Sequence, residues 1–263
     1  MTIKAVCFDL DDTLLWDERS VAETFEAVCQ DVASISGVDP VILGKAIRTE
    51  ARKLYEAQVT FPFTKRIGIN AYEGLWATFD RGQQPEFRTL EQWVPAYRSE
   101  AWYRALQVCG VDDRELGAEL GDRFVAERRR RVYLYEESMG TLDRLKGTVK
   151  LLLITNGCPA LQREKLNGVP ELISYFDDII ISGDFGIGKP DVSIFRHALE
   201  VLEVEADEAV MIGDKLTTDI QGANAAGITS IWLNRHRKSR SEEIVPTYEV
   251  EHLSEIFPLI ASL

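Results

Sequence analysis

Short apolar runs that alternate with helical stretches constrain the fold of this 263-residue chain more than any other feature. The runs Ala5–Phe8, 149–154, Asp178–Ile181 and 209–212 are apolar on both faces, which is typical of strands buried between two layers of helices. Helices are predicted over 136–146, 159–166, 191–202 and 217–226, with a further strand at Thr229–Leu233. The alternation predicts an α/β fold, a Rossmann-like doubly wound parallel sheet joined by right-handed crossovers.

The spacing of these segments predicts a second domain. The intervals from Thr155 to Lys189 and from Lys189 to Asp214 each have the length of about one βα unit, whereas the interval from Asp9 to Thr155 is several times longer. Apolar residues recur there at helical spacing. We therefore expect an all-helical cap domain over 16–132, with 61–70 as a break between its helices, inserted into a core formed by 1–15 and 133–263.

Charge and cysteine content narrow the possible partners. The chain carries 43 acidic against 30 basic side chains, a formal charge of −13, which disfavours broad contact with nucleic acid polymers or acidic lipid surfaces. Its apolar runs fall far short of the ~20 residues that cross a bilayer. The four cysteines are scattered, which favours free thiols. We expect a cytoplasmic protein with no membrane and no obligate protein partner.

Polar residues follow each predicted strand. Strands of a parallel sheet end at one edge, where ligands bind, so these residues should converge. Several carboxylates at one edge repel one another unless a divalent cation neutralises them, and oxygen ligands beside a phosphate favour Mg²⁺. Hydroxyl and amide groups can bind phosphate oxygens, and a lysine adds a fixed positive charge, a set that suits phosphoryl transfer. The residues concerned are Asp9, Asp11, Thr155, Asn156, Lys189, Asp214 and Asp219.

Four motifs in this order resemble those of the haloacid dehalogenase-like (HAD) hydrolase superfamily, in its helical-cap class (C1, subfamily I). They are Asp-x-Asp-x-Thr at Asp9, Thr-Asn at Thr155, Gly-Lys-Pro around Lys189, and Gly-Asp-x-x-x-x-Asp from Gly213 to Asp219. The predicted insertion also lies where that superfamily places its helical cap.

The resemblance implies a role for each motif residue. Asp9 would be the nucleophile that forms an aspartyl-phosphate, and Asp11 the general acid and then base. Mg²⁺ would be held by the carboxylates of Asp9 and Asp214 and by the backbone carbonyl of Asp11. Thr155, Asn156 and Lys189 would bind the phosphoryl group, and Asp219 would hold a metal-bound water or orient Lys189.

The resemblance leaves several activities open. We predict a Mg²⁺-dependent phosphatase that acts on a small phosphomonoester. The alternatives are a phosphomutase and a non-turnover aspartyl-phosphate signalling switch. A dehalogenase needs no acid two residues after its nucleophile, so Asp11 disfavours it. The whole chain is also similar to a capped group labelled phosphoserine phosphatase-like, which makes phosphoserine one candidate substrate beside sugar phosphates and nucleoside monophosphates.

Other charged residues have less specific interpretations. The basic run 128–131 is expected to be a solvated helix face, and Lys215, beside Asp214, to point to solvent. Arg66 is placed in a loop of the cap, where it could contact a substrate carboxylate.

Overall fold

A six-stranded parallel sheet forms the centre of the computed structural model, which describes residues 2–263. The strand order is β3-β2-β1-β4-β5-β6, with every pair parallel. The strands are β1 (Ala5–Phe8), β2 (Lys150–Thr155), β3 (Asp178–Ile181), β4 (Ala209–Gly213), β5 (Thr229–Leu233) and β6 (Tyr248–Val250). This confirms the predicted fold class; β6 was not predicted.

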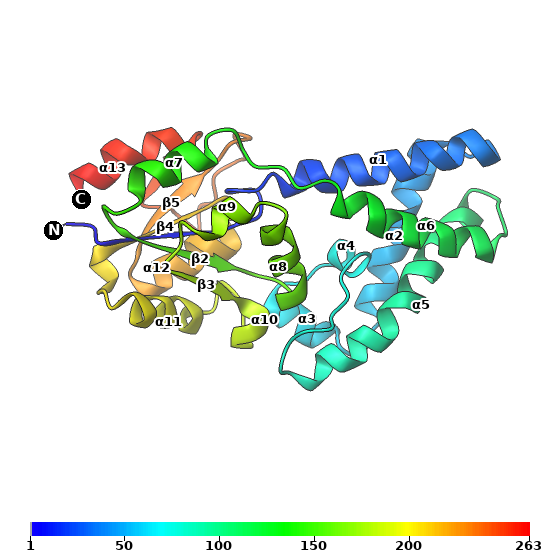
Figure 1. Ribbon diagram of the computed structural model, residues 1–263, viewed down its shortest axis with the longest axis horizontal. Coiled ribbons are helices and arrows are strands. Elements are labelled where there is room, and N and C mark those ends of the chain that lie inside the picture. Colours follow the sequence, from blue (N-terminus) through cyan, green and yellow to red (C-terminus); the bar gives the residue numbers. More distant parts are fainter. Residues whose placement is uncertain (1) are drawn as a thin grey trace. The chain divides into compact units, whose positions relative to one another are not determined.

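Helices cover both faces of this sheet (Figure 1). On one face, α11 (Val192–Leu202) and α12 (Gln221–Ala226) pack through residues such as Phe195 and Ala223 against apolar side chains of β1, β2 and β4. On the opposite face in Figure 1 lie α7 (Ser138–Leu145) and α13 (Ile256–Ser262). The remaining α-helices of this part are α8 (Pro159–Asn167), α9 (Pro170–Ile173) and α10 (Ser182–Phe185).

Two helix starts show how the sequence sets local structure. The Asp191 side chain accepts from Ser193 N at 2.9 Å and caps α11, as its position after Pro190 predicts. The helix predicted over 217–226 instead begins as a π-helical turn, Leu216–Ile220, before α12. That turn carries Asp219, so the departure from ordinary α-helix lies in a predicted site motif, where single π turns are frequent.

The chain divides into two compact units. A sheet unit contains the residues up to Trp16, Leu134–Gly157 and Gln162–Leu263, and a helical unit contains Asp17–Tyr133 and Cys158–Leu161. The last segment departs from the sequence-based boundaries, which assigned it to the core. Its Cys158 and Leu161 belong to the apolar cluster of the helical unit, since both are fully or nearly fully buried there.

Six helices form the main part of the helical unit: α1 (Asp17–Ser36), α2 (Pro40–Glu56), α3 (Phe61–Ile67), α4 (Ala71–Gly74), α5 (Pro85–Val108) and α6 (Arg114–Arg129). The expected break at 61–70 is wrong over most of its length, because α3 occupies it. Pro62 lies in the first turn of α3, where its missing N–H costs no intrahelical hydrogen bond. The helix ends at Gly68, whose φ of 80° is left-handed.

The basic run 128–131 is a mixture of solvated and buried residues. Arg130 and Arg131 lie just after the last residue of α6, so they are not on a helix face, and both pair with Glu127 of that helix. Arg128 is only 1% exposed, bonds Asp17, and lies 4.5 Å from the centre of the Trp76 ring, so the expectation of solvent exposure is wrong for it. Cation–π contact and an ion pair together compensate its burial.

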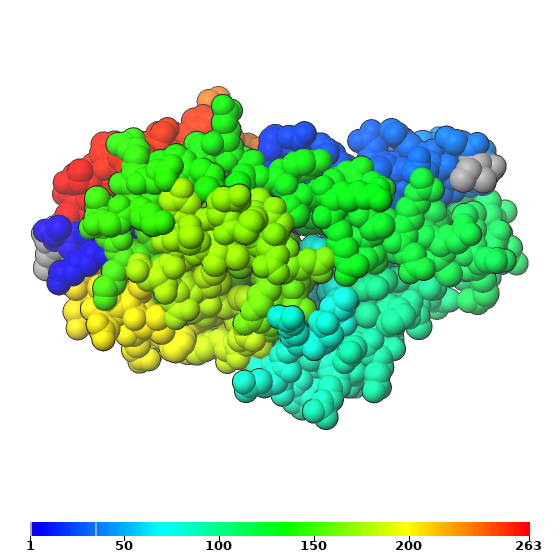
Figure 2. Space-filling view, in the orientation of Figure 1, coloured from blue at the N-terminus to red at the C-terminus, as the bar shows by residue number. Residues whose placement is uncertain are grey.

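The first described residues and α13 lie at the same end of the sheet unit and are visible on its surface (Figures 1 and 2). Every helix among the described residues is too short or too polar to pass through a bilayer. The four cysteines are free, as predicted.

Candidate active site

The carboxyl ends of the three central strands bring the first site residues together. Asp9 directly follows β1, Thr155 ends β2, and Asp214 directly follows β4. Phe8 is in register with Leu153 of β2 and with Ile212 of β4, so the three strand ends meet at one edge of the sheet. The hydrogen bond from Asp9 N to Ile212 O, 2.9 Å, extends this pairing to the aspartate itself.

Lys189 joins two of the predicted acids. Its Nζ lies 2.5 Å from Asp9 Oδ1 and 2.8 Å from Asp219 Oδ1, and it also donates to the carbonyl of Ile154 at 2.7 Å. The residue is 4% exposed, so its ammonium is almost fully removed from water. A buried cation in this arrangement is a fixed positive charge beside the predicted nucleophile.

Burial and crowding of like charges perturb these groups. Burial raises the pKa of Asp9 well above its usual value, and the carboxylates of Asp219 and Asp214 add to this against the lowering effect of Lys189. Burial, with Asp219 second, raises the pKa of Asp214 to about 6. Burial alone would lower the pKa of Lys189, but Asp219 and Asp9 outweigh it and raise that pKa. The site therefore holds more negative charge than Lys189 alone neutralises.

The three buried or half-buried acids also fit a divalent cation. Each of Asp9, Asp214 and Asp219 offers a carboxylate oxygen, and the three oxygens lie within 4.8 Å of one another. An all-oxygen donor set is what Mg²⁺ prefers. A cation there would offset both the burial of these carboxylates and the repulsion between them, which together raise the pKa values of Asp9 and Asp214. The close approach requires a glycine at 213, since a Cβ on it would lie 2.4 Å from the Asp219 carboxyl carbon.

Asp219 differs from the other two acids in its partners. Its Oδ2 accepts from Lys215 N at 3.0 Å, while its Oδ1 faces Lys189. Both oxygens thus have donors within the protein, which fits the expected orienting role better than direct metal binding. The Lys215 side chain is exposed, as expected. Asp214 instead receives Lys238 Nζ at 3.5 Å on Oδ2 and Trp232 Nε1 at 2.9 Å on its backbone carbonyl.

The Asp11 carboxylate lies outside this three-acid group. Its Oδ2 accepts from Lys165 Nζ at 2.8 Å and from Gln162 Nε2 at 3.2 Å. Its Oδ1 is buried and has no hydrogen-bond partner among the described residues. The carboxylate is therefore held on one oxygen only, while the expected metal contact of this residue involves its backbone carbonyl and not this side chain.

The two predicted phosphate ligands of β2 are already engaged within the protein. Thr155 Oγ1 accepts from Gln162 Nε2 at 2.5 Å. The amide of Asn156 donates to Lys189 O at 2.9 Å and accepts from Lys189 N at 2.8 Å, which fixes the backbone that carries the lysine. The Asn156 side-chain nitrogen carries a second hydrogen that can donate to a phosphate oxygen, so the expected phosphate contact stays a prediction while the residue also orients Lys189.

Sequence reasoning missed Gln162, Lys165 and Lys238, whose side chains contact carboxylates of the predicted acids. Gln162 and Lys165 lie one turn apart on α8, the helix after the Thr155-Asn156 strand end. Their spacing and their position directly after a motif were a usable signal. Lys238 lies in an irregular segment after β5, where no periodicity indicated its direction.

Arg66 is placed differently from the expectation. It lies in α3 and not in a loop, and its guanidinium is 5.4 Å from the centre of the Phe63 ring. Its side chain is exposed. The expected contact of Arg66 with a substrate carboxylate therefore stays a prediction.

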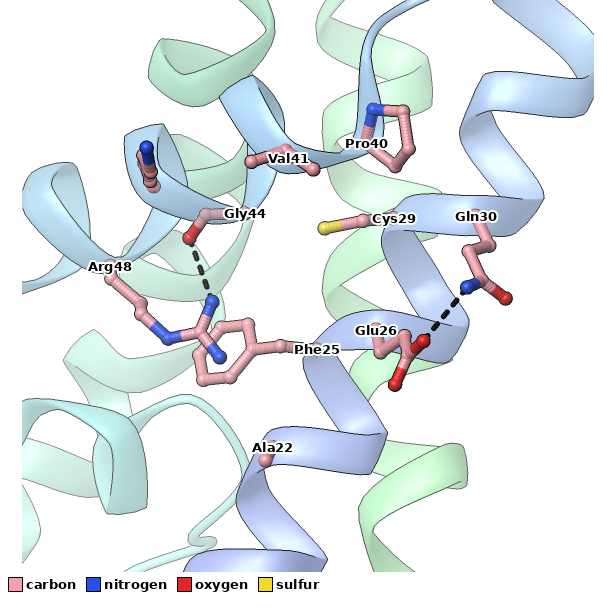
Figure 3. Close-up of a pocket in the computed structure, with 10 residues that line it drawn as sticks. Ala22, Phe25, Glu26, Cys29, Gln30, Pro40, Val41, Gly44 and Arg48 are labelled. Atoms are coloured by element: carbon pink, nitrogen blue, oxygen red, sulfur yellow. Dashed lines mark hydrogen bonds between the residues drawn. The ribbon is translucent and has the colours of Figure 1, made fainter.

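Two cavities lie within the helical unit itself. One, of about 330 Å³, is lined by residues of α1 and α2 including Cys29 and Val41. Figure 3 shows its polar groups bonded to one another: Arg48 donates to the Gly44 carbonyl and lies on the Phe25 ring, and Gln30 donates to Glu26. The other, of about 400 Å³, is lined by residues of α2, α3 and α4 such as Arg52 and Lys65. Neither contains a group of the predicted chemistry.

Comparison with known proteins gives consistent matches. Residues 3–227 match a family model described as haloacid dehalogenase-like hydrolase. A phosphoserine phosphatase of Thermus thermophilus is 36% identical over 97% of this chain and 98% of its own length. An N-acylneuraminate-9-phosphatase of Rattus norvegicus is 35% identical over 99% of this chain and 95% of its own. The Bacillus subtilis HAD-hydrolase YfnB, solved with magnesium, has the same fold, with a TM-score of 0.69 at 23% identity and 99% coverage of both chains.

Proposed function

This chain belongs to the haloacid dehalogenase-like hydrolase family and is a phosphatase of that family, and we propose that it hydrolyses a small phosphomonoester with Mg²⁺ through an aspartyl-phosphate on Asp9. One observation carries the proposal. Asp9 lies at a sheet edge beside a buried lysine, 2.5 Å away, and beside the Asp214 carboxylate, with which it fits a divalent cation. A carboxylate held between two positive charges can approach a phosphate dianion without prohibitive repulsion.

The reaction divides between the two acids of the first motif. An oxygen of Asp9 attacks phosphorus, the ester P–O bond breaks, and Asp11 gives its proton to the departing alkoxide. Asp11 then takes a proton from the water that attacks the acyl-phosphate, which releases inorganic phosphate and regenerates the Asp9 carboxylate. Each proton is accounted for by Asp11, so no further acid or base is needed.

The remaining motif residues hold charge and geometry. Lys189 presents its ammonium to the phosphoryl oxygens, and Asn156 and Asp219 fix that lysine through its backbone and its Nζ. Asp9, Asp214 and the Asp11 carbonyl would hold Mg²⁺, which when bound supplies positive charge at the transferring phosphoryl group. Thr155 adds a hydroxyl at the end of β2.

The substrate we propose is a small phosphorylated metabolite, with phosphoserine among the candidates. The relatives with closely similar sequences over almost the whole chain act, by their names, on phosphoserine and on N-acylneuraminate 9-phosphate. Two substrates of such different size on similar chains indicate that selectivity lies outside the shared motifs. We assign it to the helical cap, 16–132, and the chemistry to the core, 1–15 and 133–263. Free cysteines support a reducing, cytoplasmic location.

A phosphate-release screen over phosphorylated metabolites, with and without Mg²⁺, tests this function. We expect repeated turnover of at least one phosphomonoester and of p-nitrophenyl phosphate, each lost on addition of EDTA and restored by Mg²⁺. A single burst that leaves a stable acyl-phosphate would instead identify a signalling switch. Transfer of the phosphoryl group to a second position of a sugar phosphate, without release of phosphate, would identify a mutase.

A further inference from the structure

We propose that Gln162 and Lys165 of α8 are positioning residues for Asp11, which hold its Oδ2 so that Oδ1 delivers the proton to the leaving group. This inference rests on the proposed function, because it assigns an atom to a step of that reaction. Neither residue belongs to the four motifs, and both lie in the sheet unit with Asp11.

Lys165 provides the stronger of the two contacts. Its Nζ lies 2.8 Å from Asp11 Oδ2, and its side chain is only 1% exposed. Burying an ammonium is costly unless the charge has a partner, so a lysine at this position would be unfavourable if it served only to fill space. The ion pair with Asp11 offsets the cost of burying this ammonium.

Gln162 ties Asp11 to the second motif. Its Nε2 contacts Asp11 Oδ2 at 3.2 Å, Thr155 Oγ1 at 2.5 Å and the Asn156 carbonyl at 3.2 Å, and the residue is fully buried. One amide therefore fixes the general acid relative to the strand end that carries the predicted phosphate ligands. Side chains locked by buried hydrogen bonds in this way keep a reacting group in one orientation.

The two donors distinguish the oxygens of Asp11. Both point at Oδ2, whereas Oδ1 is buried and lacks a hydrogen-bond partner among the residues of the structure. In the protonated acid, the oxygen that accepts two hydrogen bonds serves as the carbonyl oxygen, and the proton resides on the other. The leaving oxygen of the substrate would then satisfy Oδ1 as the P–O bond breaks.

Two aryl phosphates test this assignment. Phenyl phosphate departs as a strongly basic phenolate that needs a proton, and p-nitrophenyl phosphate departs as a weakly basic one that does not. For Lys165→Met we expect kcat/KM to fall about 100-fold with phenyl phosphate and less than about threefold with p-nitrophenyl phosphate, since only the former uses general acid catalysis. Because kcat/KM reports the steps up to phosphoenzyme formation, the later hydrolysis of the phosphoenzyme does not affect the comparison of the two substrates.

Controls separate positioning from structure. Arg163 lies on the same helix, and its half-exposed side chain pairs with Asp184. For Arg163→Met, the ratio of kcat/KM with the two aryl phosphates should equal that of the wild type. Adding Lys165→Met to Asp11→Asn should change neither rate further, because both changes remove the same proton delivery. If Lys165→Met does not fold, Gln162→Leu measured with the same two substrates decides the question.

Equal losses with both aryl phosphates would overturn the inference while leaving the proposed function intact. A wild-type protein that releases phosphate from neither aryl phosphate nor any metabolite would overturn both. A much larger loss of kcat/KM with phenyl phosphate than with p-nitrophenyl phosphate in Lys165→Met, and no such unequal loss in Arg163→Met, supports the assignment.

Discussion

Lys189 is a buried cation that pairs with two of the acids at the site. It touches Asp9, Asp219 and the Ile154 carbonyl while remaining 4% exposed. Removing such a buried cation would leave two buried carboxylates without their partner, which is more costly than removing a surface charge. The same contacts that stabilise the fold therefore place the positive charge where a phosphoryl group would need it.

Arg128 and Arg130 form a matched pair for a stability measurement. Arg128 is buried against Trp76 and bonds Asp17, whereas the Arg130 side chain is 74% exposed in its pair with Glu127. We expect Arg128→Met to lower the free energy of unfolding by about 3 kcal/mol, because it breaks a buried ion pair on one side. Arg130→Met should change it by less than about 0.5 kcal/mol. Urea unfolding of the two variants measures both; similar midpoints would refute the distinction.

At the scale of single residues, the sequence predicted the motif residues but not the residues that contact and orient them. Asp9 and Asp214 directly follow strands, and Lys189 and Asp219 lie in the segments after β3 and β4, so the strand topology directs all four toward one edge of the sheet. Arg128 looked like its solvated neighbours because a run of like charges does not reveal which member turns inward. The spacing of Gln162 and Lys165 indicates that they share one face of α8, but which face of that helix turns toward Asp11 is set by packing.

Among the secondary-structure elements, the predictions failed where the local sequence pattern was too short or too ambiguous to indicate the element. The sequence does not reveal α3 because Pro62 and Gly68 together resemble one interruption, although a proline in the first turn and a glycine after the last residue are compatible with a helix between them. β6 spans three residues, too few for an alternating pattern, and it exists because β5 offers it a parallel edge. The longer strands were predicted since both of their faces are buried.

Two glycines in helices offer an element-scale prediction with a built-in control. A Cβ on Gly117 of α6 would lie 2.9 Å from the backbone of Tyr103 in α5, so the two helices would have to separate. A Cβ on Gly140 of α7 would meet no atom within 4 Å. We expect Gly117→Ala to destabilise by about 1–3 kcal/mol through overpacking. Gly140→Ala should stabilise by about 1 kcal/mol because alanine favours helix.

Thermal unfolding of both glycine variants checks this prediction. The midpoint should fall for Gly117→Ala and rise slightly for Gly140→Ala. A Gly117→Ala variant as stable as the wild type would mean that α5 and α6 tolerate a wider spacing than the structure has.

For the molecule as a whole, part of the −13 charge is concentrated at the proposed active site. Asp9, Asp214 and Asp219 offer carboxylate oxygens within 4.8 Å of one another, and burial together with this crowding raises the pKa values of the first two. A ligand that relieves the repulsion binds the folded chain and not the unfolded one, so it must stabilise the fold. The acidic composition and the proposed Mg²⁺ requirement are thus linked.

Thermal unfolding across a range of Mg²⁺ concentrations tests that link without measuring activity. Mg²⁺ at 100 times its Kd should add about 2.7 kcal/mol to the stability of the wild type. Asp214→Asn should lose most of this gain, while Asp207→Asn, in an exposed turn, should keep it. An equal Mg²⁺ effect on both variants would place the cation elsewhere.

The central claim is that Asp9 becomes phosphorylated during turnover, and acid quenching followed by mass spectrometry tests it most directly. Enzyme turning over p-nitrophenyl phosphate in Mg²⁺ should yield a peptide containing Asp9 that carries one additional phosphoryl group. Asp9→Asn should show neither that adduct nor phosphate release, because an amide is not a nucleophile for this step. Turnover by Asp9→Asn with its asparagine intact, or a phosphoryl group on another residue, would contradict the account.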